Sequence, residues 1–233
     1  MAVPRALTAN VYWLALPAFI NCYFVRLRDG WMLVDTGLPF HAGALLRHAR
    51  ALMGPGELLR FIVITHTHPD HVGALDALAL ATGAAVWVHT AGERTLREGL
   101  SPDAFPGALG ARIAAFYRRV LPYRPVEPSG TFEDGDELPF APGWRVIHTP
   151  GHTPDQCAFL DGTAGVVLTG DTVLHLAGRL VPPLALFTPD RAAARASIAR
   201  LAAHDFEIAA FGHGPPITHA AARSVRHLAA SLL

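Results

Sequence analysis

The chain has 233 residues, of which 51% are hydrophobic and 16% are charged, a composition that is typical of a folded globular protein and excludes a disordered one. Its 19 basic residues, all of them arginine, balance 19 acidic residues, so the formal net charge is zero. A neutral chain has no overall field that attracts polyanions, which argues against nucleic acid or an acidic membrane as its main partner.

The first apolar stretch, at 11–25, is too interrupted to form a membrane helix. Pro17 and Asn21 break it, and no apolar run reaches the roughly 18 residues that such a helix needs. A signal peptide would also need a cleavage site soon afterwards, and the sequence offers only a weak match. Cys22 and Cys157, the only cysteines, lie in apolar runs, where a buried thiol fits a reducing compartment. We therefore expect a cytoplasmic protein.

Apolar runs and turn residues predict strands and helices along both halves of the chain. In the first half we expect strands at 11–16, 20–27 and 31–34, a helix at 40–53, a strand at 61–64, a helix near 72–81 and a strand at 85–88. In the second half we expect strands at 144–148, 156–160 and 165–169, a helix at 190–203, a strand at 206–211 and a helix at 219–232. Clustered strands with helices outside them predict an α/β protein of two mixed sheets flanked by helices. No composition shift marks a boundary, so we expect one domain over residues 1–233.

One segment, at about 99–128, stands apart from this framework of strands. It contains five prolines around an amphipathic helix in which Ile113, Phe116, Val120 and Leu121 share one face. An insertion of this kind between core strands could form a cap over a site, because loops often carry function. An ordinary surface helix and loop explains the pattern equally well.

The strongest chemical signal is the run Thr65-His66-Thr67-His68-Pro69-Asp70-His71, which directly follows a predicted buried strand. Three imidazoles and a carboxylate are poorly suited to packing, because each polar group must be hydrated or hydrogen-bonded. They are well suited to binding zinc, iron or manganese. In an extended loop His66 and His68 point the same way, and Asp70 and His71 then turn toward a second position. One loop can therefore serve two metal ions if other loops supply the remaining ligands.

Three further loops supply residues of this type. His152, Asp171 and His213 each follow a predicted apolar strand, and each lies beside a glycine that permits a tight turn. Because strand ends gather at one edge of a sheet, we expect these loops to converge on the histidine run.

Five motifs, in this order along the chain, resemble those of the metallo-β-lactamase superfamily, and most closely its glyoxalase II-type thioester hydrolases. They run from residue 34 to residue 214: Val34-Asp35-Thr36-Gly37, His66-x-His68-x-Asp70-His71, Gly151-His152-Thr153, Gly170-Asp171-Thr172 and Gly212-His213-Gly214. A single histidine run is moderately specific, whereas five motifs in the family order are very specific. The resemblance implies a four-layer αββα sandwich of two mixed sheets flanked by helices.

The resemblance also implies a role for each candidate ligand. The first trio, His66, His68 and His152, would bind the first metal ion, and the second trio, Asp70, His71 and His213, would bind the second. Asp171 would bridge both ions. Asp35 is expected to brace the histidine loop by hydrogen bonds, although a plain turn at a strand end explains it nearly as well. Asp70 and Asp35 are our candidate catalytic residues, because Asp70 is placed to orient the nucleophile as well as to bind metal. His175 is the candidate substrate contact, with a pocket-wall histidine as its alternative; the apolar stretch at 174–187 is either a pocket wall or a packed loop.

Two divalent ions roughly 3.5–4 Å apart can share a water molecule, lower its pKa and present hydroxide at neutral pH. We therefore expect a hydrolase that uses two divalent metal ions, most simply zinc with iron or manganese as alternatives, to cleave a small-molecule ester, thioester or lactone. Such a reaction needs no serine or cysteine nucleophile. The sequence carries no indication of an oligomeric state.

Departures from the family patterns narrow the choice of substrate. Asp171 stands where one class of true β-lactamases has cysteine, which argues against that class. Leu174 stands where quorum-signal lactonases usually have tyrosine, which argues against that activity. The chain ends soon after His213, so we do not expect the C-terminal glutathione-binding region of glyoxalase II. Two other kinds of enzyme have similar ligands. One is a mononuclear iron persulfide dioxygenase. The other is a phosphodiesterase or ribonuclease, for which Arg112, Arg118 and Arg119 are the only candidate contacts to a nucleic acid.

Overall fold

The computed structural model describes residues 3–100, 112, 119 and 123–232. The predicted cap at 99–128 lies largely outside the described residues, so its role stays a prediction. Within the described part of the chain, no helix combines the length and the apolar character needed to cross a membrane.

The first half of the chain forms a seven-stranded mixed sheet whose strands lie in sequence order. Its strands are β1 (Arg5–Ala6), β2 (Val11–Leu16), β3 (Ile20–Leu27), β4 (Gly30–Val34), β5 (Leu59–Val63), β6 (Ala85–His89) and β7 (Gly130–Phe132). Neighbours from β1 to β4 are antiparallel, and neighbours from β4 to β7 are parallel. The strands predicted at 11–16 and 20–27 have these same bounds, whereas β1 and β7 are too short to show an alternating pattern in the sequence.

The second half forms a four-stranded mixed sheet in the order β13-β10-β9-β8. Its strands are β8 (Trp144–His148), β9 (Cys157–Asp161), β10 (Val166–Leu168) and β13 (Ile208–Ala210). Strands β10 and β13 are parallel, and β8, β9 and β10 are antiparallel neighbours. A separate hairpin of β11 (Leu174–Leu176) and β12 (Arg179–Val181) occupies part of the apolar stretch at 174–187.

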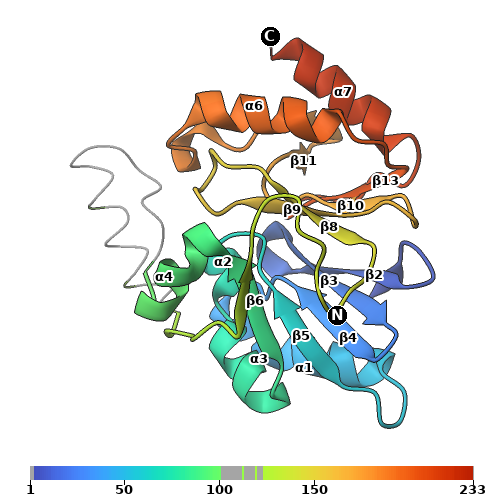
Figure 1. The fold of residues 1–233 in the computed structure, drawn as a ribbon, viewed down its shortest axis with the longest axis vertical. Coiled ribbons are helices and arrows are strands. Elements are labelled where there is room, and N and C mark those ends of the chain that lie inside the picture. The colour runs from blue at the N-terminus through green and yellow to red at the C-terminus, as the bar shows by residue number, and fades with distance from the viewer. Residues whose placement is uncertain (1–2, 101–111, 113–118, 120–122, 233) are drawn as a thin grey trace.

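Helices cover the outer face of each sheet, as Figure 1 shows. The first sheet is covered by α1 (Ala42–Leu52) and α3 (Leu75–Thr82), and the second by α6 (Arg191–Ala202) and α7 (Ala221–Ser231). All four correspond to predicted helices. Two further helices, α2 (Pro69–Val72) and α4 (Thr90–Glu98), were not predicted. The first is a single turn, and the second is largely polar, with Leu96 as its one large buried side chain.

Three clusters of buried apolar side chains define the layers. Met32 and Val34 of β4 meet Phe159 of β9 between the two sheets. Because successive side chains of a strand point to opposite faces, Leu33 packs outward toward α1 and α3, and Leu160 packs outward toward α6 and α7. Burial of each such large side chain contributes roughly 1.5–3 kcal/mol. The predicted four-layer αββα sandwich is confirmed, and its two packed sheets fix the strand ends that carry the polar loops.

Candidate metal centre

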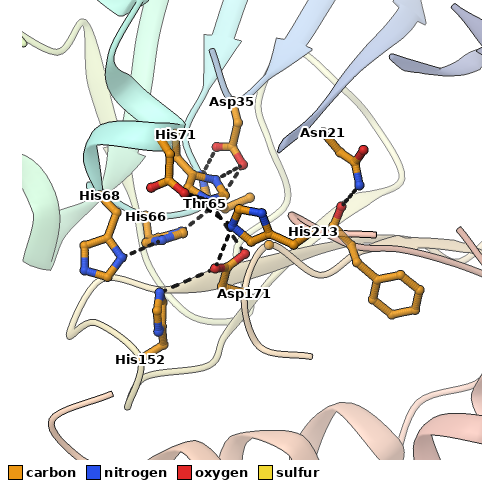
Figure 2. Close-up of polar contacts among 12 residues, drawn as sticks. Asn21, Asp35, Thr65, His66, His68, His71, His152, Asp171 and His213 are labelled. Carbon is orange, nitrogen blue, oxygen red and sulfur yellow. Dashed lines mark hydrogen bonds and ion pairs between the residues drawn. The ribbon is translucent and has the colours of Figure 1, made fainter. Parts of the chain in front are cut away.

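Loops that follow strands of both sheets meet at one place, shown in Figure 2. They bring together all seven residues predicted as metal ligands, from the loop after β5, from α2 and from the loops after β8, β10 and β13: His66, His68, Asp70, His71, His152, Asp171 and His213. Pro69 occupies the first helical position of α2, where its missing N–H is tolerated. The helical turn that it begins takes Asp70 and His71 off the extended path of His66 and His68.

The first trio consists of three buried imidazoles. His66 Nε2 lies 3.1 Å from His68 Nδ1, and the ligand atoms of His66, His68 and His152 all lie within 4.8 Å of one another. Burial, the largest cause, lowers the pKa of all three, that of His68 to about 3. Neutral imidazoles offer nitrogen lone pairs, and a cation between such lone pairs stabilises their close approach.

The second trio combines Asp70 with two imidazoles. Asp70 Oδ2 lies 3.3 Å from His213 Nε2 and 3.9 Å from His71 Nε2. Burial lowers the pKa of both histidines, but the surrounding carboxylates outweigh it and raise the pKa of His71 to about 9 and that of His213 to about 11. The carboxylates around His71 and His213 therefore favour positive charge here, which either a proton or a divalent cation can supply.

Asp171 lies between the two trios. Its Oδ2 is 3.5 Å from His152 Nε2 and 3.3 Å from His213 Nε2, and its Oδ1 is 3.6 Å from His71 Nε2. Burial alone would raise the pKa of this carboxyl, but the imidazoles of His213 and His71 hold it well below its usual value. One ionised carboxylate thus reaches histidines of both trios.

Several buried atoms in this cluster have no hydrogen-bond partner among the described residues. Those that face the centre of the cluster are His71 Nε2, His152 Nε2 and Asp171 Oδ1. An unpaired buried polar group costs about 1–3 kcal/mol, so three of them in one place are a concentrated penalty. Imidazole and carboxylate ligands in this number fit divalent zinc, iron or manganese, which would pair with atoms that the protein leaves unsatisfied.

Asp35 connects His71 to the start of the histidine loop. It follows β4 with a φ of 62°, a left-handed conformation that is uncommon outside glycine. Its Oδ2 accepts hydrogen bonds from His71 Nδ1 and Thr65 Oγ1, both at 2.8 Å, and its Oδ1 accepts one from Thr65 N at 2.8 Å. Because a carboxylate only accepts, Nδ1 of His71 carries a proton, and Nε2 is the nitrogen that faces the carboxylates of the cluster.

Two more histidines of the cluster are held through the nitrogen that faces away from it. His213 Nδ1 donates to the carbonyl of Phe19 at 3.0 Å, and His152 Nδ1 lies 3.4 Å from Thr188 Oγ1. Gly212 allows the loop after β13 to approach closely, because a Cβ at this position would overlap Asp171 Oδ1. The loops thus direct Nε2 of these histidines toward a common centre.

The structure places His175, the predicted substrate contact, beside the loop that carries His213. Its backbone N donates to the carbonyl of His213 at 3.1 Å, and its Nδ1 donates to the carbonyl of Pro215 at 2.6 Å. Its ring also packs against Phe211, with 5.6 Å between the ring centroids. These contacts fix the ring on the protein, and its role toward a substrate stays a prediction.

Two buried amides that the sequence motifs do not include contact the ligand loops. Gln156 Oε1 accepts from Asp171 N at 3.2 Å, and its Nε2 donates to the carbonyls of Cys157 and Thr169. Asn21 donates to carbonyls on both sides of His213. The sequence signal for such residues is weak: Asn21 is a polar residue that interrupts the apolar run at 20–25.

Comparisons with known proteins agree with this geometry. The model of the Metallo-beta-lactamase superfamily matches residues 15–213, a range that contains all seven clustered residues. The chain is 31% identical over 228 residues to the Bacillus subtilis protein named "Probable metallo-hydrolase YflN", which covers 90% of this chain and 82% of that protein. It is 32% identical over 117 residues to hydroxyacylglutathione hydrolase GloC of Haemophilus influenzae, which covers 50% of this chain and 51% of that protein.

A solved structure extends the likeness to three dimensions. The protein TTHA1623, solved in a di-iron-bound form, superposes on this chain with a TM-score of 0.68 at 30% identity. The superposition covers 88% of this chain and 93% of that one. The family model and the relative from Bacillus subtilis each match most of the sequence. The chain therefore belongs to the metallo-beta-lactamase superfamily of hydrolases.

Proposed function

We propose that this protein is a dinuclear metal hydrolase that cleaves a small ester, thioester or lactone. The observation that carries the proposal is the position of Asp171, whose two carboxylate oxygens lie within 3.6 Å of imidazoles from both trios. A single carboxylate between two sets of nitrogen ligands is what a two-metal centre needs, because the shared negative charge offsets the repulsion between two cations.

The donor set divides naturally between two ions. His66, His68 and His152 would hold the first, and Asp70, His71 and His213 would hold the second, with Asp171 shared. Zinc is the expected metal, because imidazole and carboxylate ligands of this kind suit it, and the di-iron form of a relative keeps iron as an alternative. When bound, the ions would lower the pKa of a water molecule to near neutrality and polarise the scissile carbonyl.

The side chains of the chain have distinct parts in this proposal. Asp70 is the more exposed of the two clustered carboxylates, with 32% of its side chain accessible against 6% for Asp171, so it is the one that can orient the attacking water and take its proton. Asp35 holds His71 through Nδ1 and so keeps Nε2 in place. His175 is our candidate for a contact with the part of the substrate that extends over the His213 loop.

The surroundings of the cluster favour a neutral acyl substrate. Phe19, whose carbonyl accepts from His213, is 85% exposed, and Leu184, whose carbonyl accepts from Thr188 Oγ1 at 2.9 Å, is 48% exposed. Exposed apolar residues whose backbone contacts the cluster suit an acyl group better than the phosphates of a nucleic acid, which need arginine or lysine. The partial likeness to GloC favours a thioester as the bond that is cleaved, and the proposal names no particular thiol.

A substrate panel on the zinc-loaded enzyme tests this proposal. We expect turnover of at least one acyl thioester, ester or lactone, no oxygen uptake, and no cleavage of phosphodiesters at a comparable rate. Oxygen consumption with a persulfide would instead indicate a dioxygenase. Phosphodiesterase activity without acyl hydrolysis would overturn the proposed substrate class.

A further inference from the structure

Asn21, a buried side chain of the first sheet, holds the loop at 211–214, which carries His213 (Figure 2). Asn21 lies in β3 and is 3% exposed. Its Nδ2 donates to the carbonyl of Phe211 at 2.9 Å and to the carbonyl of Gly214 at 2.6 Å, and its backbone N donates to the carbonyl of Gly212 at 2.9 Å. Asn21 therefore pairs with three of the four carbonyl groups of this loop.

Trp13 fixes the direction in which the Asn21 amide points. The indole Nε1 can only donate, and it lies 2.8 Å from Asn21 Oδ1. The amide nitrogen is therefore the atom that faces the carbonyls of Phe211 and Gly214, and both of its hydrogens are used. A carboxylate or an apolar side chain of the same size could not make these two contacts. The position requires a buried double donor.

The loop has little freedom beyond these contacts. The carbonyl of His213 accepts from the backbone N of His175 at 3.1 Å. Gly214 turns the chain at once, with a φ of +90°, and a Cβ there would overlap the carbonyl oxygen of His175. The imidazole of His213 thus projects from a short segment whose carbonyls are held on both sides, and a shift of that segment would move the imidazole with it.

The second trio is assembled from both sheets. His71 belongs to the first sheet's side of the site, because Asp35 after β4 holds its ring and Thr36 N donates to its carbonyl at 2.7 Å. His213 comes from the second sheet, after β13. Asn21 joins the His213 loop to the first sheet, together with Tyr23 Oη on the Phe211 carbonyl and the Phe19 carbonyl on His213 Nδ1. There His213 Nε2 lies 3.3 Å from Asp70 Oδ2. Among the described residues, the Asn21 side chain contacts this loop, Trp13 and Tyr23, and none of these belongs to the first trio.

We propose that Asn21 is a positioning residue for the second metal position. It sets where His213 presents Nε2 to Asp70 and Asp171, without touching a metal ion or a substrate itself. This inference rests on the two-metal function proposed above. It implies a selective effect. A change at Asn21 lowers the affinity for the second ion, which His213 would bind, and leaves unchanged the affinity for the first ion, which the imidazoles of the other trio would bind.

The test is Asn21→Asp, which keeps the size and shape of the side chain and replaces the double donor with an acceptor. The two stepwise affinities for Zn²⁺ and for Co²⁺ are measured by competition with a chelator, together with the Co²⁺ absorption spectrum at each step. We expect one affinity to fall by roughly 10–100-fold, the range typical of residues that orient a ligand, while the other stays within about threefold. The Co²⁺ spectrum should resemble that of His213→Ala and differ from that of His152→Ala.

Tyr23→Phe is the matched control. Tyr23 Oη also donates to the carbonyl of Phe211, at 2.6 Å, but its loss leaves that carbonyl paired with Asn21. Both metal affinities should therefore stay near those of the wild type. If Asn21→Asp does not fold, the same metal affinities and Co²⁺ spectrum are measured for Asn21→Ala. That change removes the donors without placing a carboxylate against two carbonyls.

Wild-type protein measured alongside separates this inference from the proposed function. A wild type that takes up a single ion contradicts the two-metal function. A wild type with two ions, and an Asn21 variant with two unchanged affinities, contradicts only the role of Asn21. An equal loss of affinity for both ions also contradicts the role of Asn21, because that result indicates a general effect on folding and not on the placement of His213.

Discussion

Asp35 Oδ2 lies 2.8 Å from His71 Nδ1, and this contact ties the end of β4 to the helical turn that carries Asp70 and His71. The same carboxylate accepts two hydrogen bonds from Thr65, the residue before His66. Three donors from two segments thus converge on one buried side chain. Asp35, at the end of β4, therefore positions the candidate ligands that follow β5.

Asp35→Asn should weaken metal binding or turnover by roughly 10–100-fold, because an amide can accept on only one side and would set a donor against His71 or Thr65. Metal affinity by chelator competition and kcat on a thioester substrate measure the effect. Asp161→Asn is the control: Asp161 also ends a strand and accepts from Thr163 N, but it lies away from the ligands. Equal, small effects of both changes would show that Asp35 only forms a turn.

Asp171→Ala should have a larger effect than Asp35→Ala. It removes the one carboxylate that reaches His71, His152 and His213, so at least one metal ion should be lost and the decrease should exceed the roughly 10–100-fold range of an orienting residue. Bound metal and turnover are measured for both variants. An Asp171→Ala protein with two metal ions and near-normal turnover would contradict the bridging assignment.

Gly212→Ala should disturb the centre although it adds one methyl group. Its Cβ would overlap Asp171 Oδ1 and come within 2.9 Å of His71 Cε1, so we expect at least about a tenfold loss of metal affinity. Gly162→Ala, where the added Cβ meets nothing within 4 Å, should stay within about 0.5 kcal/mol of the wild-type free energy of unfolding. Unchanged metal binding by the Gly212 variant would mean that the loop can move away without cost to the site.

Metal binding should release protons near neutral pH. In the metal-free protein, carboxylates raise the pKa of His71 to about 9 and that of His213 to about 11 against the effect of burial, so both imidazoles hold an extra proton at pH 7.5. A metal ion must displace that proton from Nε2, and metal affinity should therefore fall as the pH is lowered. Calorimetric titration in buffers of different ionisation enthalpy measures the number released. A value near zero at pH 7.5 would contradict this reading of the second trio.

The fold and the clustering of the candidate ligand residues could be predicted from the sequence because their signals are local. The histidine run and the glycine-flanked His152, Asp171 and His213 each follow a strand that is readable from its apolar residues. The layers follow from the alternation of side chains such as Met32 and Leu33 between two cores.

Other features depend on contacts between distant segments and leave no comparable signal. Asn21 contacts carbonyls about 190 positions away, and as a sequence feature it is merely a break in an apolar run. Helix α4 is largely polar, and a segment about 30 residues further along the chain contacts its end. Val126 N donates to the carbonyl of Leu96 at 3.0 Å, and Arg97 forms an ion pair with Glu127. Propensity and pattern do not predict elements and braces that tertiary contacts determine.

The number of metal ions per active chain tests the central claim most directly. Metal-free protein is titrated with Zn²⁺ while bound metal, by elemental analysis, and acyl hydrolysis are followed on the same samples. We predict that activity reaches its maximum at two ions per chain, is abolished by a chelator and returns when Zn²⁺ is restored. Full activity at one ion per chain, with no further gain from the second, would contradict the dinuclear centre built from these seven residues.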